Sequence, residues 1–194
     1  MSWSLFLKAH RKTLAASDFF AVEVWSWAGR VTYYVLFVME LATRIAGITR
    51  HPDTSWMLQM ARQLTDPDEG ILQGKRQLIV DRDAKCCRAF RDFVKRVRIE
   101  AIRLPPRSPN LNAYTERWVR SVRNECLSKL IPIGHGMLRV ALREFGAHFH
   151  HERNHQGLGN ALIMRRAFFA RRDGPVIRRP RVGGLPNYYE CAPA

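Results

Sequence analysis

The first part of the chain contains short hydrophobic runs that are rich in β-branched and aromatic side chains. Three runs cover residues 18–27, 29–41 and 43–49, and brief interruptions near Gly29 and Glu40 separate them. Val, Ile, Phe, Tyr and Trp suit the pleated surface of a sheet. The pattern therefore predicts three consecutive strands that form a meander.

Apolar positions at helical spacing first occur after these strands. In residues 54–64 the apolar side chains recur every three or four positions, and Asp53 stands where an N-cap is expected. Strands that precede and alternate with helices are typical of an α/β domain with a mixed sheet. The elements predicted next are a short buried strand at 74–81, a helix at 89–97, a strand at 99–105, a helix from Ser108 and a helix at 137–154.

The helix that starts at Ser108 has two different faces. A serine N-cap followed by proline is a favourable helix start. A helix turns by about 100° per residue, so Arg120 and Arg123 lie within about 40° of Glu116 around the helix axis. Asn112 lies one turn before Glu116. A solvated ion pair on the helix surface would explain this spacing. The apolar stripe predicted to face the core consists of Leu111, Tyr114, Trp118, Val122 and Cys126.

The charge of the chain indicates a polyanionic partner. Lys and Arg total 32 against 17 Asp and Glu, which gives a formal net charge of +15. Nucleic acid is the first expectation for this balance, and an anionic membrane surface is the second. The most apolar stretch is short and contains Glu40, so we expect no membrane span. Four cysteines without CxxC spacing argue against a disulfide framework or a zinc knuckle and favour a reducing compartment.

Two further acids give the helix glutamate a second interpretation. Asp81 ends the strand at 74–81, and Asp18 stands at the head of the first strand. Acids at strand ends and an acid on a neighbouring helix can converge, and a hard divalent cation such as Mg²⁺ relieves their repulsion. Two such ions can clamp the attacking and leaving oxygens of a phosphoryl displacement. The arginines around Glu116 would then hold a phosphate backbone at the metal site.

Three segments of the chain resemble the DDE catalytic core of retroviral-integrase-type transposases from bacterial insertion sequences. They are ASDFF around Asp18, VDRDAKCCRAF around Asp81 and SPNLNAYTERWVRSVRNECL around Glu116, with 34 residues between the last two acids. The later segment HFHHERNHQGL also resembles the family. The third motif is the most specific and the first is the least specific. The resemblance runs from about Leu14 to Leu162.

The resemblance implies an α/β, RNase H-like fold, with a five-stranded mixed sheet flanked by helices. It implies that Asp18, Asp81 and Glu116 bind two Mg²⁺ or Mn²⁺ ions, with water or a DNA 3′-hydroxyl as the nucleophile. The enzyme expected is a polynucleotidyl transferase that cleaves and transfers DNA strands in integration or recombination. Its expected partners are DNA, as transposon ends and target, and further copies of the chain on that DNA, in the bacterial cytoplasm near the nucleoid. The residues expected to bind DNA are Asn112, Arg117, Arg120 and Arg123.

The predicted organisation is a basic lead-in over residues 1–13, an integrase catalytic core domain over 14–165 and a basic, loosely structured tail over 166–194. Members of the family carry an N-terminal region that recognises the ends of the element, and the first catalytic strand here begins almost at once. We therefore expect a fragment, or a chain that needs a second protein for recognition. Cys86-Cys87 stands where the family has an aromatic and a small hydroxyl residue. The alternatives are a catalytically inactive DNA-binding remnant and an RNase H-type nuclease.

Other residues compete for these roles. Asp83 is the alternative second acid, although we expect it beyond the strand end. Glu125 is expected on the far side of its helix, in solvent. His151 and His155 have i,i+4 spacing without a third zinc ligand, so we expect hydrogen-bonded or DNA-facing imidazoles. Sheet packing rather than base stacking is expected for the aromatic residues Trp25, Trp27, Tyr33 and Tyr34.

Overall fold

Strands and helices alternate along the chain much as the hydrophobic pattern predicts. A computed structural model describes residues 5, 9–10, 12–40, 43–81, 85–104, 113–156, 159–164 and 174–192. Its elements are β1 (Leu14–Ser26), β2 (Gly29–Met39), β3 (Thr43–Thr49), α2 (Thr54–Leu64), β4 (Gln77–Val80), α3 (Arg88–Arg96), β5 (Glu100–Arg103), α4 (Ala113–Glu125), α5 (Gly134–His151), β6 (Val176–Pro180) and β7 (Asn187–Cys191).

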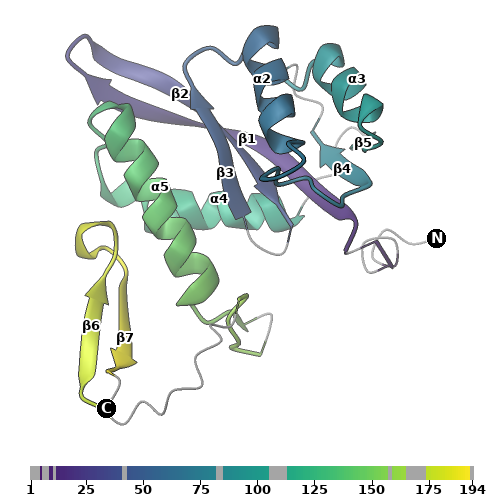
Figure 1. Cartoon of the computed structure of the whole chain (residues 1–194). Coiled ribbons are helices and arrows are strands. Elements are labelled where there is room, and N and C mark those ends of the chain that lie inside the picture. The colour runs from purple at the N-terminus through teal and green to yellow at the C-terminus, as the bar shows by residue number, and fades with distance from the viewer. Residues whose placement is uncertain are drawn as a thin grey trace. The chain divides into compact units, whose positions relative to one another are not determined.

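The first five strands form one mixed sheet in the order β3-β2-β1-β4-β5 (Figure 1). β2 and β3 are antiparallel, as a meander requires, whereas β4 pairs in parallel with both β1 and β5. Parallel neighbours need a crossover connection, and α3 supplies it between β4 and β5. The predicted five-stranded mixed sheet is therefore confirmed.

One face of this sheet is covered by α2 and α3, which lie side by side (Figure 1). Met57 and Met60 of α2 and Phe90 and Val94 of α3 are buried in a single hydrophobic cluster. The strand residues in the same cluster include Ala15, Leu36, Val38, Leu78 and Val80. These side chains alternate along their strands with others that point to the opposite face.

The opposite face is covered by α4. Trp118 of α4 is only 1% exposed, and its ring centroid lies 4.7 Å from that of Phe37 and 5.8 Å from that of Phe20. Phe20 and Phe37 alternate with Phe19 and Leu36, which belong to the cluster under α2 and α3. Helices therefore flank the sheet on both faces.

The chain divides into two compact units, and each has its own contacts. The first comprises Met1–Glu23 and Arg30–Val119, and the second comprises Val24–Gly29 and Arg120–Ala194. In the second unit α5 supplies the core, because the predicted apolar face of this helix is buried. The residues of this face are Leu138, Leu142, Phe145 and Phe149. No helix in the described ranges combines the length and the apolar character that a bilayer crossing requires.

The end of the chain differs from the prediction. β6 and β7 pair as an antiparallel hairpin, so the expectation of a loosely structured tail was wrong for residues 176–191. Polar contacts hold the strands together: Arg179 Nε donates to Glu190 Oε1 at 2.9 Å, and Arg178 Nε donates to Asn187 Oδ1 at 2.8 Å. Hydrophobic periodicity does not reveal pairing of this kind.

Candidate active site

The first predicted acid lies within a strand that is longer than expected. The sequence pattern predicts Asp18 at the head of the first strand. β1 in fact begins at Leu14, so Asp18 is an interior residue of a 13-residue strand. The added residues 14–17 pair with β4, which supplies the backbone hydrogen bonds that their low strand propensity does not predict. Asp18 is half-buried, and its Oδ1 accepts a hydrogen bond from the backbone N–H of Phe19 at 2.7 Å.

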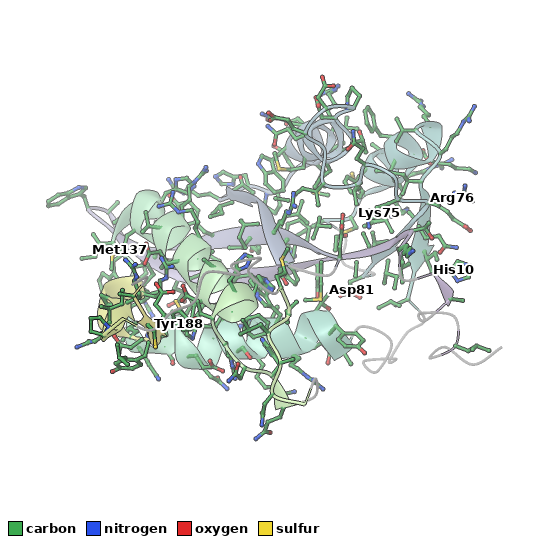
Figure 2. All side chains as sticks on the ribbon, turned by 60° about the horizontal axis from the view of Figure 1, so that its bottom comes forward. His10, Lys75, Arg76, Asp81, Met137 and Tyr188 are labelled. Atoms are coloured by element: carbon green, nitrogen blue, oxygen red, sulfur yellow. The ribbon has the colours of Figure 1, made fainter. Side chains whose placement is uncertain are left out.

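The second predicted acid, Asp81, lies directly after β4 and is exposed (Figure 2). The parallel ladder between β1 and β4 pairs Ser17 with Val80. One step further along both strands brings Asp18 opposite Asp81. Neighbouring strands are about 4.8 Å apart, and residues paired in this way project to the same face. The ladder itself ends at Ser17 and Val80, and its continuation by one residue would bring the two carboxylates to the same face.

Both carboxylates belong to the face that α4 covers. Asp18 precedes by two positions Phe20, whose ring contacts Trp118 of α4. Asp81 follows Val80, which is buried in the opposite cluster under α2 and α3. Side chains two positions apart on a strand share a face, and adjacent ones point to opposite faces.

The third predicted acid, Glu116, is exposed in the first turn of α4. It lies two residues before Trp118, the side chain that packs the helix against the sheet. All three acids thus belong to the first unit and to one side of its sheet. Across the described ranges, no three His, Cys, Asp or Glu side chains are gathered closely enough to hold a metal ion. Only the continued register of β1 and β4 relates Asp18 to Asp81, and among the described residues Glu116 forms no common ligand group with them.

Comparison with known proteins finds a family model that matches part of the chain and solved structures of similar fold. Residues 97–162, which include β5, α4 and α5, match the family model described as integrase core domain. The catalytic domain of the Mos1 mariner transposase superposes with a TM-score of 0.54 at 14% identity, covering 75% of this chain and 77% of that one. The family model thus matches about a third of the chain, and the solved domain shares its fold.

A second solved structure has the same fold. A chain of the simian T-cell lymphotropic virus intasome, solved in complex with PP2A regulatory subunit B56 gamma, gives a TM-score of 0.53 at 10% identity. The match covers 94% of this chain and 67% of that chain. A search of curated proteins found no match. The five-stranded sheet and its flanking helices form an RNase H-like fold, as the resemblance implied.

The arginines of α4 are all exposed. Arg117, Arg120 and Arg123 project from the helix on which Glu116 lies. In the part of the chain that the structure describes, no ion pair joins Glu116 to Arg120 or Arg123, so a surface ion pair does not account for this spacing. The predicted residues Asn112, Leu111 and Asp83 lie outside the described residues.

The buried stripe of α4 differs from the prediction at Tyr114. Tyr114 was expected in the core but is 69% exposed, whereas Thr115 is buried. At about 100° per residue, Thr115 lies within about 20° of Val122 around the helix and Tyr114 lies about 80° away from it. Trp118, Val122 and Cys126 are buried as predicted.

Two competing candidates have structural partners in the second unit. Glu125, which was predicted to be solvated, accepts hydrogen bonds from Arg153 Nη1 at 2.6 Å and 2.7 Å. The side chain of Glu125 is still 38% exposed, but its pairing with Arg153, which follows α5, was not predicted. His155 Nε2 lies 2.8 Å from the carbonyl oxygen of Phe149, which agrees with the hydrogen-bonded imidazole that was expected.

The sequence pattern does not predict the buried charge cluster at the end of α5. Glu152 is 7% exposed, accepts a hydrogen bond from Arg181 Nη2 at 2.6 Å, and lies 3.2 Å from His148 Nδ1. Burial raises the pKa of Glu152, but the hydrogen bonds from Arg181 and His148 outweigh it and hold the pKa below its ordinary value. The partners are 29 residues apart in the chain, so no local pattern indicates the pair. This cluster fastens the β6–β7 hairpin to α5.

Proposed function

We propose that this integrase core catalyses metal-dependent cleavage and transfer of DNA strands, with Asp18, Asp81 and Glu116 as the metal ligands. The register of β1 against β4 gives the strongest support, because its continuation by one residue would pair Asp18 with Asp81 on the face that carries α4. Glu116 is assigned as the third ligand because it lies on that helix, within the same unit.

The pair of aspartates fits a hard divalent cation. Two carboxylates held side by side repel each other, and Mg²⁺ or Mn²⁺ bound between them removes that repulsion. Mg²⁺ takes one or two carboxylates, keeps several waters and accepts phosphate oxygens, so Asp18 and Asp81 can hold a first ion. When bound, two ions would stabilise the attacking and leaving oxygens of a phosphoryl transfer.

The exposed arginines of α4 would position the DNA. Arg117, Arg120 and Arg123 can each contact a backbone phosphate, and Asn112 is proposed to join them. Such contacts fix the position of a duplex without reading its sequence. The name of one matched structure refers to an intasome, and we propose that several copies of this chain assemble on DNA as well.

A disintegration assay tests this proposal, because it asks for strand transfer on a branched DNA without recognition of element ends. The wild type would be compared with Glu116→Gln and with Glu100→Gln, which changes an exposed carboxylate on β5 outside the site. We expect product with Mg²⁺ or Mn²⁺, no product with EDTA or with Glu116→Gln, and an unchanged yield with Glu100→Gln.

Three other outcomes of this assay would contradict part or all of the proposal. Activity retained in Glu116→Gln would refute the ligand assignment. Intact DNA binding by a wild type that gives no product would support the inactive remnant. Cleavage of RNA–DNA hybrids without strand transfer on DNA would support the RNase H-type nuclease.

A further inference from the structure

Two tryptophans expected to pack in the sheet are exposed at the tip of the β1–β2 hairpin. Trp27 is 109% exposed and Trp25 is 49% exposed, so the expectation of sheet packing was wrong for both. Trp27 lies in the turn, where no sheet face exists to bury it. Trp25 follows Val24, which is fully buried, so its side chain projects to the opposite side of the strand.

The turn that presents Trp27 has a defined shape. Ser26 Oγ donates a hydrogen bond to the carbonyl oxygen of Gly29 at 2.9 Å and accepts one from the N–H of Ala28 at 3.3 Å. Gly29 has a φ of 99°, a conformation that glycine adopts without strain. Both hairpin strands end at this tip (Figure 1). A side chain on such a turn loses less freedom on binding than one on an irregular loop.

Trp25 joins the tip to a larger apolar surface within the second unit. The backbone N–H of Trp25 donates a hydrogen bond to the carbonyl oxygen of Pro132 at 2.9 Å, and Trp25 forms a parallel β-bridge with Ile133. Ile133 N–H in turn lies 3.3 Å from Met137 Sδ. If a whole Trp side chain presents about 250 Å², the two tryptophans alone expose on the order of 400 Å², within the range of the largest patch on a typical monomer. The exposed aliphatic neighbours are Ile131, Ile133, Met137 and Val140.

The charges of this unit favour a polyanion as the occupant. Every acidic side chain of the second unit that the structure describes accepts a hydrogen bond: Glu125 from Arg153, Glu144 from the N–H of Val182, Glu152 from Arg181 and Glu190 from Arg179. Exposed cations without an acidic partner among the described residues include Lys129, Arg139 and Arg143. A second copy of the chain carries the same excess of positive charge, so charge repulsion disfavours it as the occupant.

We propose that Trp27, supported by Trp25, stacks on unpaired or unstacked bases of DNA. Aromatic side chains beside a basic surface bind single strands by stacking on successive bases, and apolar wedges also open base steps in duplexes. The inference rests on the DNA-binding role proposed above, but it does not involve the three acids. Trp27 is a binding residue for the DNA strand rather than part of the metal site.

Binding in EDTA tests the inference without any catalysis. A single-stranded oligonucleotide that contains 2-aminopurine and a matched duplex would be titrated with the wild type, Trp27→Ala and Trp27→Phe. Tyr189→Ala is the control, because Tyr189 is an exposed aromatic residue of the same unit. Trp27→Ala should weaken single-strand binding by roughly 5- to 150-fold and abolish the fluorescence change, with a smaller effect on the duplex. Trp27→Phe should restore most of the affinity, and Tyr189→Ala should leave it unchanged.

The salt dependence separates stacking from charge. A lost stacking contact lowers affinity by the same factor at every salt concentration, so the slope of log K against log salt should stay constant. Unchanged single-strand affinity in Trp27→Ala, or a loss that appears as a reduced slope, would overturn the proposal. It would also be overturned if Trp27→Ala instead lowered the oligomer mass in sedimentation, since the tip would then join copies of the chain.

The two proposals can fail separately. A wild type that binds single strands through Trp27 but gives no strand-transfer product would reject the proposed catalysis alone. A wild type that gives product while Trp27→Ala binds single strands normally would reject the stacking role alone.

Discussion

Replacing Trp118 by alanine probes the packing that holds α4, and with it Glu116, on the sheet. Trp118 is 1% exposed and lies against the rings of Phe20 and Phe37. Truncating a buried Trp to Ala costs about 3–5 kcal/mol, and the two lost aromatic pairs, at about 0.5–1.5 kcal/mol each, contribute part of that figure. We therefore expect the free energy of unfolding to fall by about 3–5 kcal/mol.

Trp118→Phe is the matched comparison for this variant. It keeps an aromatic ring against Phe20 and Phe37 but removes the indole Nε1–H, which is buried without a hydrogen-bond partner among the described residues. An unsatisfied buried donor costs about 1–3 kcal/mol, so its removal offsets much of the lost ring volume. The net cost should be about 0–2 kcal/mol.

Urea unfolding followed by far-ultraviolet circular dichroism measures both variants. Fluorescence is less suitable, because the signal comes from five tryptophans and each variant removes one. If Trp118→Ala lowered the free energy of unfolding by less than about 1 kcal/mol, Trp118 would not be the residue that holds α4 on the sheet. A cost for Trp118→Phe equal to that of Trp118→Ala would refute the claim that the indole N–H is unsatisfied.

Three further expectations follow from single sites. A Cβ at Gly47 would lie 2.7 Å from the indole ring of Trp56 in α2. Gly47→Ala should therefore lower the free energy of unfolding by about 1–3 kcal/mol in the same urea experiment. Burial raises the pKa of the Cys126 thiol to about 11, so at pH 8 a thiol reagent should modify half-buried Cys87 in the folded chain and Cys126 only after unfolding. The pKa of Glu152 lies below its ordinary value, because hydrogen bonds from Arg181 and His148 outweigh the effect of burial. The stabilisation from Glu152 is then present above the ordinary pKa and lost as pH falls through the depressed one. The amide protection factors of the β6–β7 hairpin, which are corrected for the intrinsic exchange rate, should therefore fall in acid, and Glu152→Gln should remove this pH dependence.

Elements with one buried face could be predicted from the sequence. The α5 helix buries the four residues that its periodicity indicates. Asp53 is the N-cap of α2, and its Oδ1 accepts a hydrogen bond from the N–H of Trp56 at 2.8 Å. Both features depend on residues close together in the chain. Local patterns are therefore sufficient for them.

The alignment of the first two acids could not be predicted in the same way. Leu14-Ala15-Ala16-Ser17 has little strand propensity, and it is extended because β4, more than 60 residues later, pairs with it. This pairing makes Asp18 an interior strand residue, and its continuation by one residue would set Asp18 opposite Asp81. A motif spacing along the chain contains no information on register between strands.

Polar and exposed features account for the remaining differences. The β6–β7 hairpin is held by Arg179 and Glu190 and by their polar neighbours, and such contacts have no hydrophobic period. Trp27 has the composition of a sheet residue, but its place in a two-residue turn removes any face against which it could pack. Hydrophobicity alone cannot separate a buried aromatic side chain from one that is exposed for binding.

Mn²⁺ binding measured by electron paramagnetic resonance tests the central claim, the shared metal site of Asp18 and Asp81, without any DNA substrate. The wild type would be compared with Asp18→Asn, Asp81→Asn and the double variant, with Glu100→Gln as the control. If the two carboxylates share one ion, each single variant should lose nearly as much affinity as the double variant. Losses that simply add, or Mn²⁺ binding that none of the variants weakens, would contradict the shared site.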